Sequence, residues 1–155
     1  MPEPVFERPD ERSGLSNPVG GYVDIKLRGD RSGGSLTAFE TLVAPGQGPP
    51  LHTHAAEDET LFVLEGRVRF KLGDEMHTGD VGSFVFVPRG IPHTFQNVGD
   101  DRARMLIHFT PSGMERFFDA FARLDAPSPE DFARLGAEAG MVVVGPPLAR
   151  SHPAA

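Results

Sequence analysis

The sequence predicts an all-β fold, a sandwich or small barrel of antiparallel strands, with short helices at its C-terminal end. Between residues 21 and 110, short runs of β-branched and aromatic residues alternate with turn clusters that contain glycine. No βαβ pattern occurs there, so a parallel sheet is not expected. The length of 155 residues is typical of one domain and is enough for an independent core.

The first 20 residues precede this pattern and differ from it in composition. Residues 1–18 hold four prolines and mixed charges but, after Met1, only three large apolar side chains. We therefore expect residues 1–20 to form an arm that is flexible or lies on the surface. The barrel is expected over residues 21–110, in strands that cover Tyr22–Leu27, Leu36–Val43, Thr60–Leu64, Val68–Leu72, Ser83–Val87, His93–Asn97 and Arg104–Phe109.

Residues 111–155 are expected to form a helical extension packed on the barrel. A second helix of this extension should begin at Ser128, an N-cap followed by Pro129 and two acids, and should end before Gly140. The apolar run Met141–Val144 is short enough to pack as a last strand. The first helix is predicted by apolar residues that recur at intervals of three and four: Met114, Phe117, Phe118, Phe121 and Leu124.

Composition narrows the classes of partner. Lysine and arginine total 15 against 22 acidic residues, a net charge of −7, and no basic face for nucleic acid is visible. The longest apolar runs are too short to cross a membrane, and the N-terminal residues lack the pattern of a secretory signal. Without cysteine, the chain has neither disulfides nor thiolate ligands. We expect a cytoplasmic protein with a small-molecule substrate and no nucleic-acid or membrane partner.

Three histidines and one glutamate predict a metal site. His52 and His54 are two residues apart, so on an extended segment both rings leave the same face, about 6.6 Å apart. Glu59 follows at the start of an apolar strand, and His93 opens a later strand. Alone, such a histidine pair beside a proline-rich loop is more often solvent-exposed. Together, the imidazoles and the carboxylate suit one divalent transition metal, Fe, Mn, Ni or Co, with Zn also possible.

The spacing of these residues resembles both signature motifs of the cupin superfamily, without a gap. Fifteen residues separate the two motifs, which resembles the short spacing of bacterial single-domain cupins. The segments around residues 111–121 and 145–148 are similar to those of single-domain cupins of the quercetinase-like type. The resemblance covers roughly residues 36–110. The matching positions are Gly46, His52, His54, Glu59 and Gly66 in the first motif, and Gly82, Pro88, Gly90, His93 and Asn97 in the second.

This resemblance implies an antiparallel jelly-roll (RmlC-like) β-barrel of six to eight strands. It implies one metal ion per chain, held inside by His52, His54, Glu59 and His93. It also suggests a homodimer. The strand residues 60–64 and 84–87 agree with a dimer, because they are apolar on both faces. One face must pack inside the barrel, and the other must be covered by the C-terminal helices or by a second subunit.

The remaining candidate residues have structural explanations that we prefer. His77 is expected on the surface, and His108 is expected as a hydrogen-bonded core histidine. Glu57 and Asp58 are expected to be solvated loop charges, and Asn97 to hydrogen-bond at a strand end. The phenylalanine-rich helix is expected to form a lid over the barrel or a dimer contact. Three strand phenylalanines are expected to be packing residues, with a substrate pocket as the alternative: Phe84, Phe86 and Phe95.

The similarity to quercetinase-like cupins implies a metal-dependent dioxygenase that acts on an aromatic or enolic small molecule. Glu59 would be its catalytic residue, the general base for an enol or phenol hydroxyl at the metal. The first alternative is a non-redox metal-dependent isomerase or cyclase. The second is a cupin that binds a small ligand without turnover, which the lack of a basic helix-turn-helix weakens.

Overall fold

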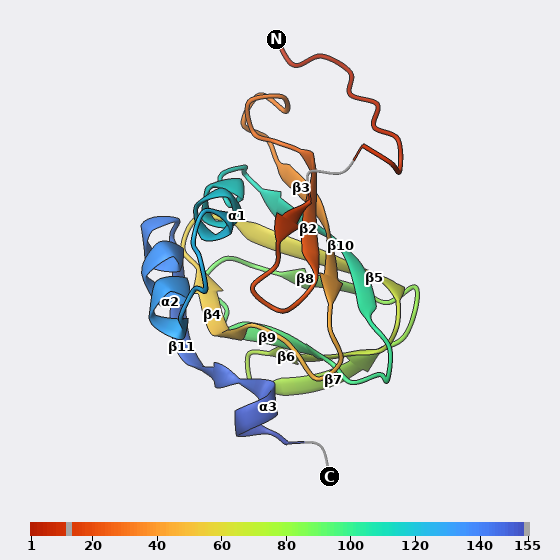
Figure 1. Ribbon diagram of the computed structural model, residues 1–155, viewed down its shortest axis with the longest axis vertical. Coiled ribbons are helices and arrows are strands. Elements are labelled where there is room, and N and C mark those ends of the chain that lie inside the picture. Colours follow the sequence, from red (N-terminus) through yellow and green to blue (C-terminus); the bar gives the residue numbers. More distant parts are fainter. Residues whose placement is uncertain (12–13, 154–155) are drawn as a thin grey trace.

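The computed structural model describes residues 1–11 and 14–153 and confirms the all-β jelly-roll architecture (Figure 1). Two antiparallel sheets face each other and do not close into a continuous barrel. The first has the strand order β1-β2-β3-β10-β5-β8, and the second has the order β11-β4-β9-β6-β7. The strands are β1 (Leu15–Ser16), β2 (Tyr22–Leu27), β3 (Thr37–Val43), β4 (Pro50–His54), β5 (Asp58–Glu65), β6 (Val68–Leu72), β7 (Glu75–Gly79), β8 (Phe84–Val87), β9 (His93–Asn97), β10 (Ala103–Thr110) and β11 (Met141–Pro147).

The core lies between the two sheets and follows from the two-residue period of the strands. Along β10, every second side chain, from Ala103 to Phe109, is buried, while the residues between them are partly exposed. Strand β10 pairs with β3 on one side and β5 on the other, so Ile107 lies opposite both Phe39 and Leu61. The inward apolar side chains of the two sheets therefore form one continuous core.

The C-terminal part of the chain forms three helices: α1 (Glu115–Ala122) and α2 (Pro129–Glu138) lie between β10 and β11, and α3 (Leu148–Ser151) follows β11. The predicted cap of α2 is confirmed, because the Ser128 hydroxyl accepts from the Asp131 N–H and the Asp131 carboxylate accepts from the Ser128 N–H. Helices α1 and α2 pack together through Phe117 and Phe132, whose rings lie 5.1 Å apart. They cover one side of the sandwich, where α2 runs beside β11 (Figure 1). No helix in the described parts of the chain has the length and apolarity needed to cross a membrane.

Polar bonds fix the start of α1 to the loop between β2 and β3. The Glu115 carboxylate accepts from the backbone N–H of Gly29 at 2.8 Å and from that of Gly113 at 2.9 Å. The Thr37 hydroxyl also donates to this carboxylate. One turn further along, Asp119 binds Arg28 through two bonds of 2.8 and 3.0 Å. Helix α1 is therefore tied to the first sheet by charged side chains as well as by its apolar face.

Three strands were not expected from the sequence. Strand β4 holds His52 and His54, and two prolines at its start obscure the alternation of a strand. Strand β7 is exposed at four of its five positions, so it has no apolar pattern to detect. Strand β1 is very short and pairs with β2, which places residues 15 and 16 in the first sheet. Part of the segment expected as an arm thus enters the fold.

Candidate metal centre

Four side chains from three strands converge between the two sheets. His52 and His54 are buried on the inward face of β4, and His93 opens β9 directly opposite His52. Glu59 is the second residue of β5, in the other sheet. One ligand atom from each of these side chains lies within 4.8 Å of all the others. The structure therefore brings together all four residues that the sequence predicts as ligands.

Backbone carbonyls orient two of the imidazoles. His52 donates from Nδ1 to the carbonyl oxygen of Pro50 at 2.8 Å, and His93 donates from Nδ1 to that of Ile91 at 2.9 Å. Each acceptor lies two residues before its histidine. With Nδ1 protonated, Nε2 is the atom that can give a lone pair to a metal ion. Sequence reasoning missed both carbonyls, because a main-chain acceptor has no residue signature.

Glu59 and His93 form a buried ion pair, with 2.6 Å between Oε2 and Nε2. Burial alone would raise the pKa of the Glu59 carboxyl, but the charge of His93 and the contacts with both imidazoles hold that pKa well below its usual range. Burial would lower the pKa of His93, and the Glu59 carboxylate outweighs burial and raises it. Burial and the neighbouring imidazoles lower the pKa of His52 to about 3, so that ring is neutral.

His54 has buried nitrogen atoms with no hydrogen-bond partner in the described parts of the chain. Its Nε2 lies 3.2 Å from Glu59 Oε2 without making a hydrogen bond, and its Nδ1 has no hydrogen-bond partner among the described residues. A buried polar atom without a partner is costly. Donors at about 2.0–2.2 Å from a shared ion lie within about 4.3 Å of one another, so small side-chain shifts would let these four donors surround one ion. Three imidazoles and a carboxylate fit a divalent transition metal.

Two contacts link the segments that carry the ligand candidates. Arg89, in the loop before β9, donates its backbone N–H to Asp58 at 2.9 Å, and its guanidinium binds the same carboxylate at 3.1 and 3.2 Å. The Gly90 N–H donates to the His54 carbonyl at 2.8 Å. Gly90 has a φ of 82°, which favours glycine. The expectation that Asp58 is merely solvated was wrong, because this carboxylate anchors the loop that leads to His93.

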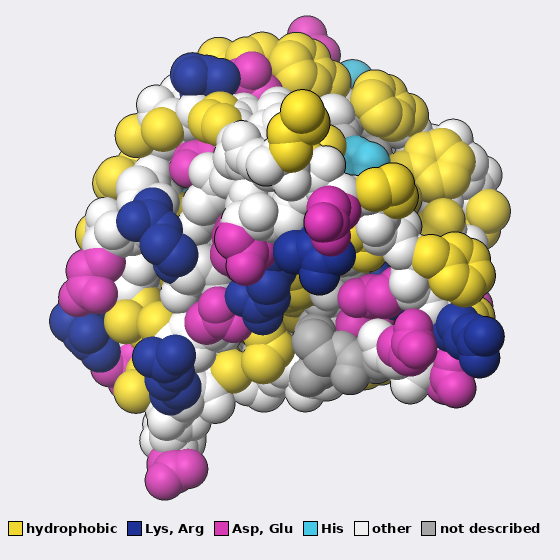
Figure 2. All heavy atoms as spheres, turned by 90° about the horizontal axis from the view of Figure 1, so that it is seen from above, with side chains coloured by type: hydrophobic (Ala, Val, Ile, Leu, Met, Phe, Trp, Pro, Cys, Tyr) yellow, Lys and Arg dark blue, Asp and Glu magenta, His cyan; other side chains and the backbone are white. Residues whose placement is uncertain are grey.

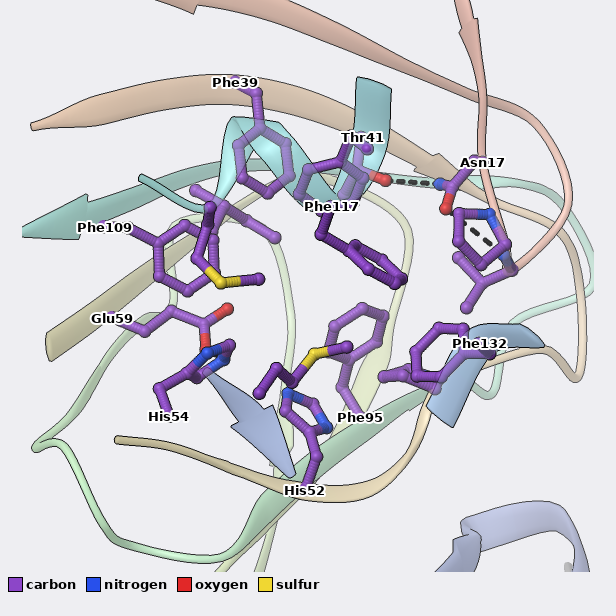
Figure 3. Close-up of a pocket in the computed structure, with 17 residues that line it drawn as sticks. Asn17, Phe39, Thr41, His52, His54, Glu59, Phe95, Phe109, Phe117 and Phe132 are labelled. Atoms are coloured by element: carbon purple, nitrogen blue, oxygen red, sulfur yellow. Dashed lines mark hydrogen bonds and ion pairs between the residues drawn. The ribbon is translucent and has the colours of Figure 1, made fainter. Parts of the chain in front are cut away.

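His52, His54 and Glu59 lie at one end of a cavity of about 60 Å³ (Figure 3). This is smaller than the roughly 300–1,000 Å³ of pockets for drug-sized ligands, so the cavity suits a small substrate. Helices α1 and α2 supply part of its wall, which agrees with the predicted lid. The apolar side chains in the wall are Phe39, Phe95, Ile107, Phe109, Met114, Phe117, Phe118, Phe132 and Met141.

A polar pair lies at the other end of this cavity. Figure 3 shows Asn17 and Thr41 joined by a hydrogen bond, across the cavity from His54 and Glu59. Asn17 also donates from Nδ2 to the carbonyl oxygen of Leu42 at 2.6 Å. Residue 17 belongs to the segment expected as an arm, and no pattern in the sequence links it to Thr41. Sequence reasoning therefore missed both residues.

A larger groove of about 330 Å³ lies next to the cavity. The two share Pro18, Val19, Pro49 and Phe132 in their walls. Phe132 comes from α2, and the three other residues come from loops between strands. These four side chains form the partition between the groove and the cavity.

Three of the other predictions about aromatic and histidine side chains need correction. Phe95 lines the cavity, but Phe84 and Phe86 are 65% and 55% exposed on the outer face of β8 and pack in no core. His108 is not a core histidine: it lies half-buried on the outward face of β10. The expected surface position of His77 is confirmed, and this ring pairs with Glu75 at 3.1 Å.

Of the predictions for the polar residues Glu57 and Asn97, the first was wrong and the second is confirmed. Glu57 was expected to be solvated, but it is only 4% exposed, and one of its carboxylate oxygens has no hydrogen-bond partner among the described residues. Burial raises the pKa of Glu57. Asn97 is fully buried and donates to the carbonyl oxygens of Val43 and Asp101 at 3.0 and 2.7 Å. Its predicted role at a strand end is confirmed.

Sequence comparison agrees with the two motifs. The sequence model of the cupin domain family matches residues 39–109. Polyketide synthase CurC of Streptomyces cyaneus is 33% identical over 70 residues, which are 45% of this chain and 46% of CurC. The chain spans about half the length of the curated relatives it matches.

Solved structures show the same fold. KdgF from a Halomonas species superposes with a TM-score of 0.63 at 18% identity, over 70% of this chain and 94% of KdgF. The polyketide cyclase RemF from Streptomyces resistomycificus gives a TM-score of 0.61 at 20% identity, over 71% of this chain and 81% of RemF. Fold and side-chain cluster together define a jelly-roll protein with a candidate metal centre. Residues 39–109 of the chain form a cupin domain.

Proposed function

We propose that this protein is a metal-dependent enzyme that acts on an aromatic or enolic small molecule. The observation that carries the proposal is the position of His52, His54 and Glu59 at one end of a cavity walled by phenylalanines. The apolar wall suits a flat, apolar substrate body. The buried donors suit a divalent metal such as Fe, Mn, Ni, Co or Zn.

Each residue of the site has a role in this proposal. His52, His54, His93 and Glu59 would hold the metal, which supplies Lewis acidity toward an enol or phenol oxygen and, if redox-active, electron transfer with dioxygen. Glu59 would take the proton of the substrate hydroxyl, because it is the carboxylate nearest the cavity. The phenylalanines of α1 and α2 would exclude water around the reacting groups.

The first candidate reaction is dioxygenation, as in quercetinase-like cupins. The second is a non-redox cyclisation or isomerisation, which the name of the structural neighbour RemF, a polyketide cyclase, favours. Both reactions start from a deprotonated enol or phenol, so both need the same site. The two reactions differ in the oxygen atoms that they add to the substrate. A dioxygenase adds both atoms of O₂, whereas an isomerase or cyclase adds none.

One experiment separates these reactions and also tests for turnover. The protein is loaded in turn with Fe(II), Mn(II), Ni(II), Co(II) and Zn(II) and incubated with a panel of catechols, flavonols and β-diketones. Oxygen uptake and product mass are recorded with and without air. We expect oxygen uptake and products whose combined mass, including any carbon monoxide released by ring cleavage, is two oxygen atoms greater than that of the substrate. A product of unchanged mass that forms without air would instead establish the non-redox reaction. Binding without any product would contradict the enzyme proposal.

We also propose that the protein is a homodimer and that it is cytoplasmic. On the outer face of the first sheet, Phe84 and Phe86 are largely exposed, and Phe62 lies opposite Phe84. The C-terminal helices pack mainly on β1, β9 and β11 instead of on this face. Figure 2 shows one face of the molecule, on which many hydrophobic side chains lie toward the upper and right edges. The helices leave the outer face of β8 exposed. We therefore propose that this face packs against a second copy of the chain in the dimer.

A further inference from the structure

The hydroxyl group of Thr41 is a buried polar group for which the proposed function gives no role. Thr41 is only 3% exposed, and it projects into the cavity from the same face of β3 as Phe39. Apart from His52, His54 and Glu59, the polar side chains in the described cavity wall are Thr41 and Asn17. The cavity therefore has polar groups at its two ends and apolar groups between them (Figure 3).

Asn17 determines how the Thr41 hydroxyl can act. Asn17 donates from Nδ2 to Thr41 Oγ, so this oxygen is an acceptor in that bond and its hydrogen is left for another partner. No residue in the described parts of the chain accepts that hydrogen. Asn17 is itself held in place, because its Nδ2 donates to the Leu42 carbonyl at 2.6 Å and its Oδ1 accepts from the Val19 N–H at 3.2 Å. Thr41 is thus a fixed hydrogen-bond donor that faces the cavity.

We propose that Thr41, oriented by Asn17, donates a hydrogen bond to a carbonyl oxygen at the end of the substrate farthest from the metal centre. The inference rests on the proposed function, which places an enol or phenol hydroxyl at the metal centre. It narrows the substrate class to a flat molecule with that hydroxyl at one end, a carbonyl oxygen at the other and an apolar body between them. An analogue without the carbonyl oxygen leaves the buried Thr41 donor unpaired, so it binds less tightly.

The test uses two probes of nearly equal shape. 3,4-Dihydroxyacetophenone and 4-isopropenylcatechol share a catechol head, but the second has a CH₂ group in place of the carbonyl oxygen. Their dissociation constants are measured by calorimetry on the Zn(II)-loaded protein under argon, where no oxygenation occurs. The quantity of interest is the ratio of the two constants. Comparing this ratio between variants cancels the effect of the carbonyl group on the acidity of the catechol.

We expect Thr41→Val to reduce the preference for the ketone about three- to tenfold, the size of one net hydrogen bond. Thr41→Ser keeps the hydroxyl and should keep most of the preference, and Asn17→Ala should lose part of it. Thr94→Val is the matched control. Thr94 is also a buried threonine, but its hydroxyl donates to the Pro49 carbonyl at 2.6 Å and lies outside the cavity wall. This control should leave the preference unchanged.

The outcomes distinguish this inference from the proposed function. If His54→Ala abolishes catechol binding while Thr41→Val keeps the wild-type preference, the Thr41 subsite is overturned and the metal centre is supported. If Thr94→Val reduces the preference as much as Thr41→Val does, the effect acts through the fold and the subsite is overturned too. If neither probe binds the wild-type protein, the proposed function and the subsite both fail. Circular dichroism of each variant confirms that it is folded.

Discussion

Replacing Glu115 with glutamine should loosen helix α1 and the part of the lid that this helix carries. One carboxylate oxygen accepts from the Gly29 N–H, and the other accepts from the Gly113 N–H and the Thr37 hydroxyl. These bonds hold the start of α1 against the loop between β2 and β3. Phe117 and Phe118, which line the cavity, follow directly in the same helix.

The expected cost follows from the number of these bonds. A hydrogen bond to a charged group contributes about 1.5–3 kcal/mol and a neutral one about 0.5–1.5 kcal/mol, so each bond that the glutamine oxygen keeps loses about 1 kcal/mol. The NH₂ group of glutamine cannot accept, so a backbone N–H on that side loses its bond entirely. The three bonds together therefore give at least about 3 kcal/mol, and the partial exposure of Glu115 reduces this sum by solvent screening. We therefore expect the Glu115→Gln variant to lose about 2 kcal/mol of unfolding free energy at pH 7.

The same bonds predict how this loss depends on pH. Burial would raise the pKa of Glu115, but the hydrogen bonds from Thr37, Gly29 and Gly113 outweigh burial and lower it from its ordinary value of 4.5. A carboxyl with a lowered pKa in the folded state stabilises the protein above its unfolded pKa, and this stabilisation is lost as the pH falls through the folded pKa. The difference between wild type and variant should therefore be largest near pH 7 and should shrink below pH 4.5.

Urea unfolding at pH 7 and pH 3.5, followed by circular dichroism, measures both effects. Glu130→Gln is the matched control, because it makes the same change in the first turn of α2, where the described residues offer Glu130 no hydrogen-bond partner. The control should differ little from wild type at either pH. An equal loss of stability in both variants, or a Glu115→Gln difference that stays the same at pH 3.5, would refute the reasoning.

Three further predictions follow from the site and the surface. Glu59→Gln should keep a substantial share of its metal through the three histidines, while turnover per bound metal falls about 10²-fold or more; activity that merely follows metal occupancy would make Glu59 a ligand only. Phe132→Ala should speed the association of a catechol probe in stopped-flow experiments, because Phe132 lies in the partition between groove and cavity; an unchanged rate would rule out access from the groove. Light scattering at micromolar concentration should show a dimer, and a Phe84→Ser/Phe86→Ser double variant should shift it to a monomer; a monomeric wild-type protein would contradict the proposed interface.

The candidate ligands could be predicted from the sequence because each motif is local. His52 and His54 share a face through the two-residue period of a strand, and the turns around Gly90 bring His93 into position within a few residues. The C-terminal helices were predictable for a similar reason. The apolar spacing of α1 and the Ser128 cap of α2 depend only on neighbouring residues.

The features that were missed depend on contacts between distant segments. Asn17 and Thr41 are 24 residues apart and meet only because β1 and β2 place residue 17 beside β3. Glu57 looks like a loop charge in the sequence, and its burial becomes visible only when the loop is folded against the body of the protein. Phe84 and Phe86 fit a core strand by composition, but β8 lies at the edge of its sheet and turns both rings outward.

The metal content of the protein tests the central claim most directly. Elemental analysis of the purified wild-type protein should find about one divalent ion per chain. His54→Ala should lose most of it while circular dichroism shows an intact fold, because His54 contributes a ligand and little of the apolar core. His77→Ala, a change at an exposed histidine outside the cluster, should keep the wild-type content. Full metal content in the folded His54→Ala variant would contradict the account.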